Sequence, residues 1–505
     1  MVLDFRPQHQ DDFTLFFSIF QGKHSICDEK NKVLYLLSET NRILGDKMSD
    51  TKIKDFTQGN ITKQLLTFSL PIFLSNLLQV IYNMVDMIIV GNKLGKTGIS
   101  AVSVGGDVTA LLTFIAMGFA SAGQVLIARL IGFGRKRELG RFVGTMCGFL
   151  LTSAVVISII GFFLRHQMLR LMNTPSEAYE GALAYSIICM IGLVFIYGYN
   201  MTSAILRGMG DSKHPFLFIG IAAVINLFLD VVLVLGLDFG VSGAAIATVV
   251  SQAVSFLACI VFLAKHKEQF SLEITKKDFF CWDKDMLTDL VKLGTPMAIK
   301  SASIQVSKLF VNSWINSYGL VVSAFAGIAN KVASISNLVS MAMNTAGSTM
   351  VGQNIAAAKN ERVKQILKKL AVLTLSIATV FSIVFILFPE PIFGIFTKET
   401  EVLAIAMGYI PIAVLLFYGG ALRAVMNALM NGSGNTKVNF ATAILDGIVL
   451  RIGLSLLFGL AFDMKHYGFW LGDALAGFTP FFIGIVFYFS GRWKYEARDD
   501  NALLH

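Results

Sequence analysis

Long apolar stretches separated by short polar segments dominate this chain. A helix needs about 20 apolar residues to cross the hydrocarbon core of a membrane. Twelve stretches reach about that length: 65–91, 101–128, 142–164, 181–206, 216–237, 239–264, 286–318, 322–352, 370–388, 402–430, 438–462 and 468–490. The longest polar gap, from Lys265 to Lys284, divides them into two sets of six. The pattern predicts an all-α membrane protein with twelve transmembrane helices.

One motif occurs twice, at equivalent places in the two sets. It reads LRGMGDSK at 206–213 and MNGSGNTK at 430–437, 224 residues later. Because six is even, both halves enter the membrane from the same side, so we expect a pseudo-two-fold axis along the membrane normal. The chain is therefore predicted to form two six-helix lobes. The predicted parts are an N-lobe over 61–266, a cytoplasmic linker over 267–285, a C-lobe over 286–492 and a cytoplasmic tail over 493–505.

Other matched positions favour lobes that move against each other. Pro71, early in the first helix of the N-lobe, matches Pro296 in the C-lobe. Small and flexible residues late in the second helix also recur, as Met117, Ala122 and Gly123 and as Met341, Ala346 and Gly347. Proline bends a helix, and small residues let helices approach closely and slide.

Residues 1–60 precede the first predicted helix and differ from the rest. The first 47 are mixed and charged, without sustained periodicity. Two interpretations stay open for them: a cytoplasmic tail, or an upstream stretch included by too early a start codon, which we favour. In either case we expect 1–60 to be disordered or mis-assigned, with little function.

The composition excludes a soluble globular domain. The mean hydropathy is +0.66, and 55% of the residues are hydrophobic while 15% are charged. The net charge of +9 does not indicate nucleic acid, because the basic residues lie in short loops between apolar stretches. The loops after the second and eighth spans are the richest in them: Arg129, Arg135, Lys136, Arg137 and Arg141, and Lys359, Arg362, Lys364, Lys368 and Lys369. This bias predicts a multi-pass protein of a bacterial-type inner membrane with both termini cytoplasmic. The five cysteines form no CxxC pair, so we expect neither a disulfide framework nor a cysteine metal site.

Two acidic residues lie deep in predicted spans of the N-lobe. An ionisable side chain at membrane depth costs at least about 2.5–3.5 kcal/mol, so each needs a reason. Asp86 shares a helix face with Gln79, Tyr82 and Asn83, at three- and four-residue spacing. Asn226 and Asp230 lie one turn apart in the fifth span, and Thr248 in the sixth is a further hydroxyl.

A pair of carboxylates with neutral oxygens nearby can hold a proton or a small cation. We therefore predict a coupling site from Asp86, Asn226, Asp230 and Thr248, with Asp86, Asn226 and Asp230 as candidate ligands of Na⁺. The alternative interpretation is a carboxylate satisfied by hydroxyls and amides that only holds helices together.

The C-lobe does not repeat these acids. Leu454 matches Asp230, and the position of Asp86 falls near Phe310 or Val311. Its predicted spans carry Lys300, Lys308, Lys331, Arg423, Asp446, Arg451 and Asp473 instead. Lys300 and Lys308 either line a cavity or pair internally with Asp446, and we favour internal pairing. The candidate substrate-cavity residues are Gln79, Tyr82, Asn83, Asn200, Lys300, Gln305 and Lys308.

From about Thr62 to Trp493 the chain resembles the multidrug and toxic compound extrusion (MATE) family of secondary transporters. The segments that carry the resemblance are YNMVD at 82–86, the motif at 206–213, NLFLD at 226–230 and the second motif copy. The resemblance implies two six-helix lobes in a V and efflux of amphipathic, often cationic compounds in exchange for Na⁺ or H⁺. It assigns the N-lobe cation site to Asp86, Asn226, Asp230 and the Thr248 hydroxyl.

Another branch of the family uses a glutamate in the seventh helix and an aspartate in the tenth. Here those helices carry Gln305 and Tyr418, which points to the DinF-like branch. We expect a monomer in the lipid bilayer that acts on small molecules, without a cofactor other than the coupling ion.

The sequence has features of two other classes to compare with a multidrug exporter, a flippase and an intramembrane enzyme. A lipid-linked oligosaccharide flippase of the same superfamily is the closest, because Lys300, Lys308 and Arg451 suit a pyrophosphate group. An intramembrane enzyme is disfavoured, because no histidines stand at HExxH spacing and the glycine motif lacks the spacing of a phosphate loop.

Overall fold

The computed structural model describes residues 53–172, 174–270, 272 and 283–494, and every regular element in these ranges is a helix. The N-lobe elements are α3 (Ile61–Gly132), η2 (Lys136–Glu138), α4 (Leu139–Leu171), α5 (Ser176–Ile191), α6 (Leu193–Gly208), α7 (Lys213–Asp230), η3 (Val231–Gly236) and α8 (Gly240–Lys265). The C-lobe elements are α10 (Lys284–Asn316), α11 (Leu320–Ala356), α12 (Asn360–Leu387), α13 (Pro389–Gly394), α14 (Thr400–Gly432), α15 (Thr436–Ile444), η4 (Leu445–Val449), α16 (Leu450–Leu456), η5 (Leu457–Ala461), α17 (Lys465–Ala476) and α18 (Thr479–Ser490).

These helices make up the twelve predicted spans. Within the described ranges, nine continuous helices are long and apolar enough to cross a membrane, and α5 with α6, bent by 54°, forms a tenth span. The 72-residue α3 contains two spans, because Gly95 interrupts it with a φ of 63° that favours glycine. The 33-residue α10 is the twelfth span, and its polar side chains explain its lower hydropathy. The prediction of twelve transmembrane helices in two six-helix lobes is confirmed.

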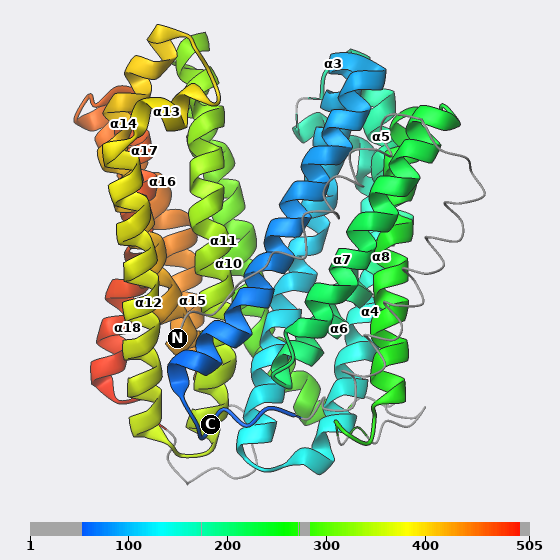
Figure 1. The fold of residues 1–505 in the computed structure, drawn as a ribbon, viewed down its shortest axis with the longest axis vertical. Coiled ribbons are helices and arrows are strands. Elements are labelled where there is room, and N and C mark those ends of the chain that lie inside the picture. The colour runs from blue at the N-terminus through cyan, green and yellow to red at the C-terminus, as the bar shows by residue number, and fades with distance from the viewer. Residues whose placement is uncertain (1–52, 173, 271, 273–282, 495–505) are drawn as a thin grey trace, which may run out of the picture. The chain divides into compact units, whose positions relative to one another are not determined.

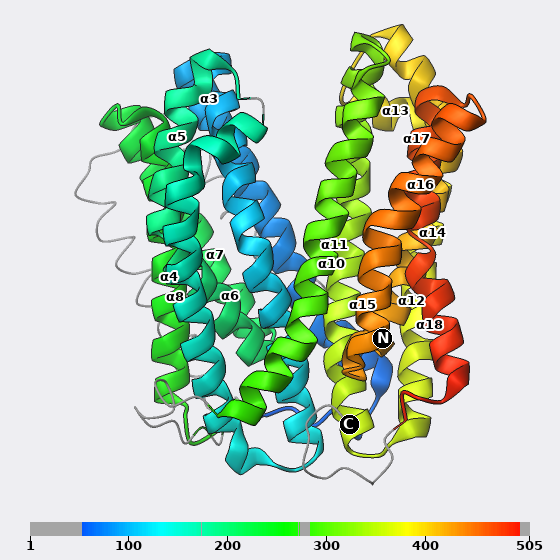
Figure 2. The same ribbon diagram turned by 180° about the vertical axis from the view of Figure 1, so that it is seen from behind.

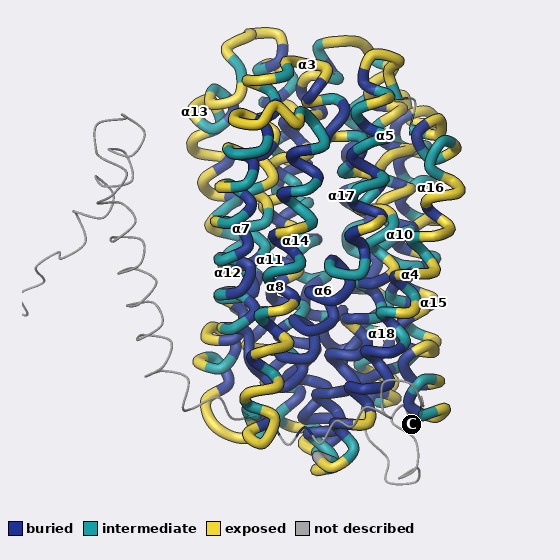
Figure 3. The backbone as a smooth tube through the Cα atoms, turned by 90° about the vertical axis from the view of Figure 1, so that its right-hand side faces the viewer, coloured by how far each residue is buried: buried dark blue, intermediate teal, exposed yellow. Residues whose placement is uncertain are grey.

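The two lobes lie side by side, with α3 to α8 in one and α10 to α18 in the other (Figures 1 and 2). They meet at one end only, where the amide of Gln124 donates to the hydroxyl of Thr349 at 2.6 Å. At this end Arg129 also donates to the carbonyl of Ser433 at 3.1 Å. A Cβ at Gly118 would overlap the backbone of α10, so the lobes touch where the side chains are smallest. We call this the closed end. Buried residues gather there (Figure 3), and the helices diverge toward the other end.

The repeated motif forms the turn between two helices in each lobe. Gly210 and Gly434 have φ values of 87° and 71°, a backbone region that glycine adopts without strain. The next residue then caps the following helix: Asp211 accepts from the backbone N–H of Lys213, and Asn435 from that of Val438. The motif is therefore a helix stop followed by a helix start, and this explains why both halves retain it.

The first helix of each lobe begins against the other lobe. Ile61, Leu65 and Phe68 of α3 belong to an apolar core made mostly of α11, α12 and α14. At the start of α10, the backbone N–H of Asp283 donates to Thr145 of α4, and its carboxylate pairs with Arg141 at 3.4 Å. This exchange ties the lobes together at the closed end.

Residues 53–60, part of the predicted N-terminal extension, make defined contacts. Phe56 is 2% exposed, and its backbone bonds to Gln353, Asn354 and Arg362 of the C-lobe. The predictions for residues 1–52, and for most of the linker and the tail, fall outside the described residues.

Candidate cation site in the N-lobe

Two helices of the N-lobe bring the predicted acids together. Asp86 comes from the first half of α3, and Asn226 and Asp230 come from the last turns of α7. Asp86 is 5% exposed, Asn226 1% and Asp230 0%. The carboxyl groups of Asp86 and Asp230 lie close enough to interact with each other. Two residues 144 positions apart in the sequence thus form one buried acid pair.

This pair has no positive partner among the described side chains, because no ion pair includes either aspartate. Around the acid pair, the buried oxygens without a hydrogen-bond partner are Asp86 Oδ1, both carboxylate oxygens of Asp230, Asn226 Oδ1 and Gln252 Oε1, and the Asn226 Nδ2 donor also has none. Buried polar atoms are normally hydrogen-bonded, so this group of unsatisfied oxygens needs an explanation. Carboxylate and amide oxygens are hard ligands, and a proton or a small hard cation would satisfy them.

Hydroxyl and amide groups surround the acid pair. Gln252 of α8 donates to the hydroxyl of Tyr82 at 3.4 Å, and Tyr82 lies one turn before Asp86. Thr248 donates its hydroxyl proton to the carbonyl of Ala244 at 3.0 Å, so its oxygen lone pairs stay available. Tyr185 of α5 lies near both Thr248 and Asp86. The four predicted coupling residues therefore lie in one region of the N-lobe.

The local backbone departs from a regular helix at this site. The segment η3, a π-helical turn, starts directly after Asp230 and continues α7 to Gly236. Single π-helical turns inside α-helices occur frequently at functional sites. The break places the acid at the point where the fifth span changes its winding.

The predicted cavity residues differ in how far they are exposed and in their distance from the acid pair. Gln79 is half-buried and Asn83 is exposed, so Asn83 lies outside the buried group. Asn200 donates to the carbonyl of Ile196 within its own helix at 2.8 Å, and Gln305 is exposed on α10. Over the described part of the chain, no three His, Cys, Asp or Glu residues form a metal-binding group, so an ion here would need amide and hydroxyl oxygens in addition to the two carboxylates.

Sequence reasoning missed three polar residues of the N-lobe. Gln252 and Tyr185 border the acid pair, and Asp107 is an exposed acid on the second half of α3. All three stand inside predicted spans, which was the available signal. Their relation to the acid pair depends on how the helices pack, and helical spacing within one span does not give it.

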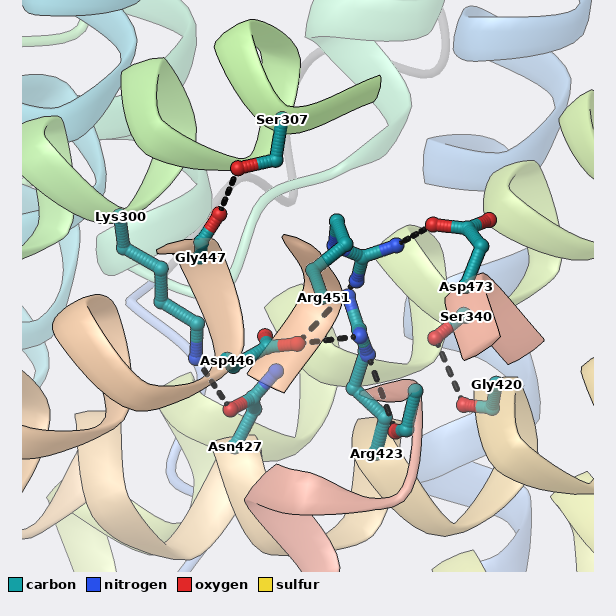
Figure 4. Close-up of polar contacts among 11 residues, drawn as sticks. Lys300, Ser307, Ser340, Gly420, Arg423, Asn427, Asp446, Gly447, Arg451 and Asp473 are labelled. Atoms are coloured by element: carbon teal, nitrogen blue, oxygen red, sulfur yellow. Dashed lines mark hydrogen bonds and ion pairs between the residues drawn. The ribbon is translucent and has the colours of Figure 1, made fainter. Parts of the chain in front are cut away.

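The charged residues of the C-lobe form a separate network (Figure 4). The Asp446 carboxylate accepts from Arg423 at 2.8 Å and from Arg451 at 3.1 Å, and Arg451 also pairs with Asp473. Lys300 donates to the amide oxygen of Asn427 at 2.6 Å. The favoured pairing of Lys300 and Lys308 with Asp446 is not observed: both arginines bond to Oδ1 of that carboxylate, and Oδ2 is buried without a hydrogen-bond partner. Among the described residues neither lysine makes an ion pair.

Comparison with known proteins agrees with this architecture. A family model described as MatE matches residues 71–232 and 296–457, one match in each lobe. The Bacillus subtilis protein YpnP, named a probable multidrug resistance protein, is 30% identical over 445 residues, which cover 88% of this chain and 98% of YpnP. YoeA of the same organism, with the same description, is 31% identical over 87% of this chain and 95% of its own length.

Solved structures show the same fold. A MOP superfamily transporter from Pyrococcus furiosus, for which a reversed polarity of the binding pocket is described, gives a TM-score of 0.80 at 23% identity. The two chains are covered to 87% and 98%. The outward-facing conformation of a multidrug resistance MATE transporter gives 0.80 at 22% identity, over 87% of this chain and 98% of the other.

Proposed function

This chain belongs to the MATE family of membrane transporters, and from that premise we propose that it is a cation-coupled antiporter. It exports amphipathic, often cationic compounds and admits Na⁺ or H⁺ in exchange. The multidrug resistance relatives support the export of drugs, and the missing acids at Gln305 and Tyr418 support a place in the DinF-like branch. The protein is multi-pass, and we propose that it is a monomer of the inner membrane. The basic loops favour an orientation with the closed end and both termini on the cytoplasmic side.

One observation carries this proposal: the buried, unsatisfied acid pair of Asp86 and Asp230. A purely structural acid pair would be satisfied by donors from neighbouring helices. Here the neighbouring groups are mainly oxygens that also lack partners. The site therefore suits a ligand that arrives from solution, carries positive charge and leaves again.

Coupling follows from the way such a site responds to its ligand. Binding of a cation or a proton neutralises charge among α3, α7 and α8, and so changes the relative stability of the two lobe arrangements. Transport against a gradient requires that ion and substrate stabilise different arrangements or compete for one. A coupling free energy typical of proteins corresponds to about a 5- to 150-fold change in affinity.

The structure has its lobes joined at the closed end and apart at the other. To expose the opposite side, the contacts from Gln124 to Thr349 and from Arg129 to Ser433 must break. These few hydrogen bonds contribute about 0.5–3 kcal/mol each, which ion or substrate binding can offset. Opening must also release the packing of Gly118 against α10 and the contacts of residues 54–56 with both lobes.

The test is dye efflux from reconstituted vesicles with Na⁺ and pH gradients imposed separately. We expect one gradient to drive export of a fluorescent cationic dye by the wild type, and Asp230→Asn to abolish this dependence. Asp238→Asn is the matched control, because Asp238 is an exposed acid eight positions away, and its surface pair with Lys93 adds little stability. A folded protein that moves no dye under either gradient would reject the proposal and favour the lipid-linked oligosaccharide flippase.

A further inference from the structure

We infer that the C-lobe contains a cavity, lined by Lys308, Arg423 and Arg451, that binds the acidic group of an amphipathic substrate. The acidic group is a carboxylate or a phosphate. This inference rests on the proposed function and deepens it by naming a substrate class. Compounds that carry both an apolar body and an acidic group would be exported along with the cationic ones.

The first observation is an imbalance of charge. The ionisable residues of the network are Lys300, Lys308, Arg423, Asp446, Arg451 and Asp473, four cations against two carboxylates. Both carboxylates are already paired with arginines (Figure 4). Asp446 and Arg451 are 0% and 2% exposed, so water screens this excess less than it would on the surface of a soluble protein. Unpaired positive charge inside a membrane protein is costly, and a bound anion would offset it.

The second observation is a cavity at the same place. Its volume is about 40 Å³, and its charged lining comes from Lys308 of α10, Arg423 of α14, Arg451 of α16 and Asp473 of α17. Asn337 of α11 also lines it. The Nε atom of Arg451 is buried without a hydrogen-bond partner. A cavity that holds one water has roughly 10–15 Å³, so this one has room for a small acidic group.

The cavity adjoins a polar face of the C-lobe. On α11 the exposed side chains include Asn330, Ser334 and Asn337, which recur at three- and four-residue spacing and so form one stripe. Lipid does not tolerate a row of exposed polar side chains at membrane depth. The stripe therefore borders the aqueous space between the lobes, and a substrate in that space can reach the cavity beside Asn337.

The third observation is that the matching positions of the N-lobe lack these charges. The N-lobe residues 224 positions before Lys308, Arg423, Asp446 and Arg451 are Met84, Tyr199, Ala222 and Leu227, none of them charged at neutral pH. Asp446 lies in the π-helical segment η4, whereas Ala222 lies in regular α-helix of α7. The same scaffold is thus built without these charges, and the C-lobe carries them for another reason.

Lys308 gives the sharpest variant, because its removal leaves no carboxylate unpaired. We would measure dye binding to purified protein by fluorescence anisotropy, with a xanthene dye bearing a free carboxylate and with the methyl ester of the same dye. Lys308→Met should weaken binding of the carboxylate dye by about 10- to 100-fold, as expected for the loss of one charge-assisted hydrogen bond. Binding of the methyl ester should stay within about twofold of the wild type.

Two further variants control for charge and for folding. Lys308→Arg should keep most of the preference for the carboxylate dye, since the positive charge remains. Lys292→Met removes an exposed lysine from the same helix, about 24 Å away along its axis, and should leave both dyes unaffected. Equal loss of both dyes in Lys308→Met, or no loss of either, would overturn the inference.

Inorganic phosphate distinguishes a substrate group from a free anion. We expect it to displace the carboxylate dye only at concentrations far above that of the dye, because it lacks an apolar body. Phosphate that binds as tightly as the dye would instead make the cavity a free-anion site and overturn the substrate class. Failure of the proposed function would show separately, as an absence of gradient-driven efflux of the methyl ester. Dye binding to the detergent-solubilised protein would still decide this inference.

Discussion

The segment before the first helix is expected to hold the closed end together. The backbone N–H of Lys54 donates to the Met209 carbonyl of the N-lobe at 3.1 Å, and Gln353 of the C-lobe donates to the Lys54 carbonyl at 3.0 Å. The Phe56 ring lies against Gly210 of the N-lobe and inside the core that α11 and α12 help to form. Residues 54–56 therefore bridge the two lobes.

The duplication explains why a bridge fits here. Arg129 donates directly to the Ser433 carbonyl, and the residues 224 positions away from these two are Gln353 and Met209. The lobes thus offer two equivalent contacts, and Lys54 occupies the second one between Gln353 and Met209. The bridge must leave at least one lobe before the closed end can open.

The perturbation is Phe56→Ala. Truncation of a buried phenylalanine costs about 3–5 kcal/mol, and Phe56 is 2% exposed. If the Phe56 site exists only while the lobes touch, this cost falls on the closed-end contact alone. At about 1.4 kcal/mol per factor of ten, the equilibrium between touching and separated lobes should shift toward separated lobes by two orders of magnitude or more.

The assay is the distance between spin labels at Lys213 of the N-lobe and Glu361 of the C-lobe, both exposed near the closed end. We expect Phe56→Ala to add a population with longer distances. Phe142→Ala is the matched control, because Phe142 is buried within the N-lobe core and should lower the unfolding temperature without moving the lobes. Unchanged distances in a folded Phe56→Ala protein would refute the bridging role.

Three further outcomes are expected. Asp446→Asn leaves Arg423 and Arg451 without their shared carboxylate, so thermal unfolding should show a loss of about 3–5 kcal/mol, whereas a loss below 1 kcal/mol would contradict this ion-pair role. Gly118→Val places a larger side chain against the α10 backbone at the closed end, so spin-label distances should lengthen there and dye efflux should fall. Unaltered distances would contradict this, because the lobes would then accommodate the valine without separating. Asp86→Asn removes one acid of the buried pair, so ion-driven efflux should fall at least tenfold while the unfolding temperature stays near that of the wild type. Ion-driven efflux that persists in this variant would show that other groups couple the ion to transport.

Much of this molecule is predictable from sequence because its elements are long and repeated. Apolar length gives the twelve spans, and the repeated motif gives the two lobes. The three- and four-residue spacing of Tyr82 and Asp86 places them on one helix face, and the family motifs point to Asp230. The structure adds that these residues meet at one site.

What the sequence does not give depends on packing between distant segments. The Asp446 carboxylate attracts arginines on α14 and α16 in preference to the lysines on α10, and one-helix spacing cannot rank these partners. Gln252 reaches Tyr82 across 170 residues. Phe56 lies in a polar stretch without periodicity, so nothing in its surroundings indicates that the ring is buried between two lobes.

The central claim is that Asp86 and Asp230 link ion binding to substrate binding. The most direct measurement is the dissociation constant of a cationic dye for the detergent-solubilised protein, across a range of Na⁺ concentrations and of pH. Since linkage is reciprocal, the account predicts that one of these ions weakens dye binding about 5- to 150-fold at saturation, and that Asp230→Asn removes the dependence while Asp238→Asn keeps it. Dye affinity that ignores both ions in the wild type, or an ion dependence that Asp230→Asn leaves intact, would contradict it.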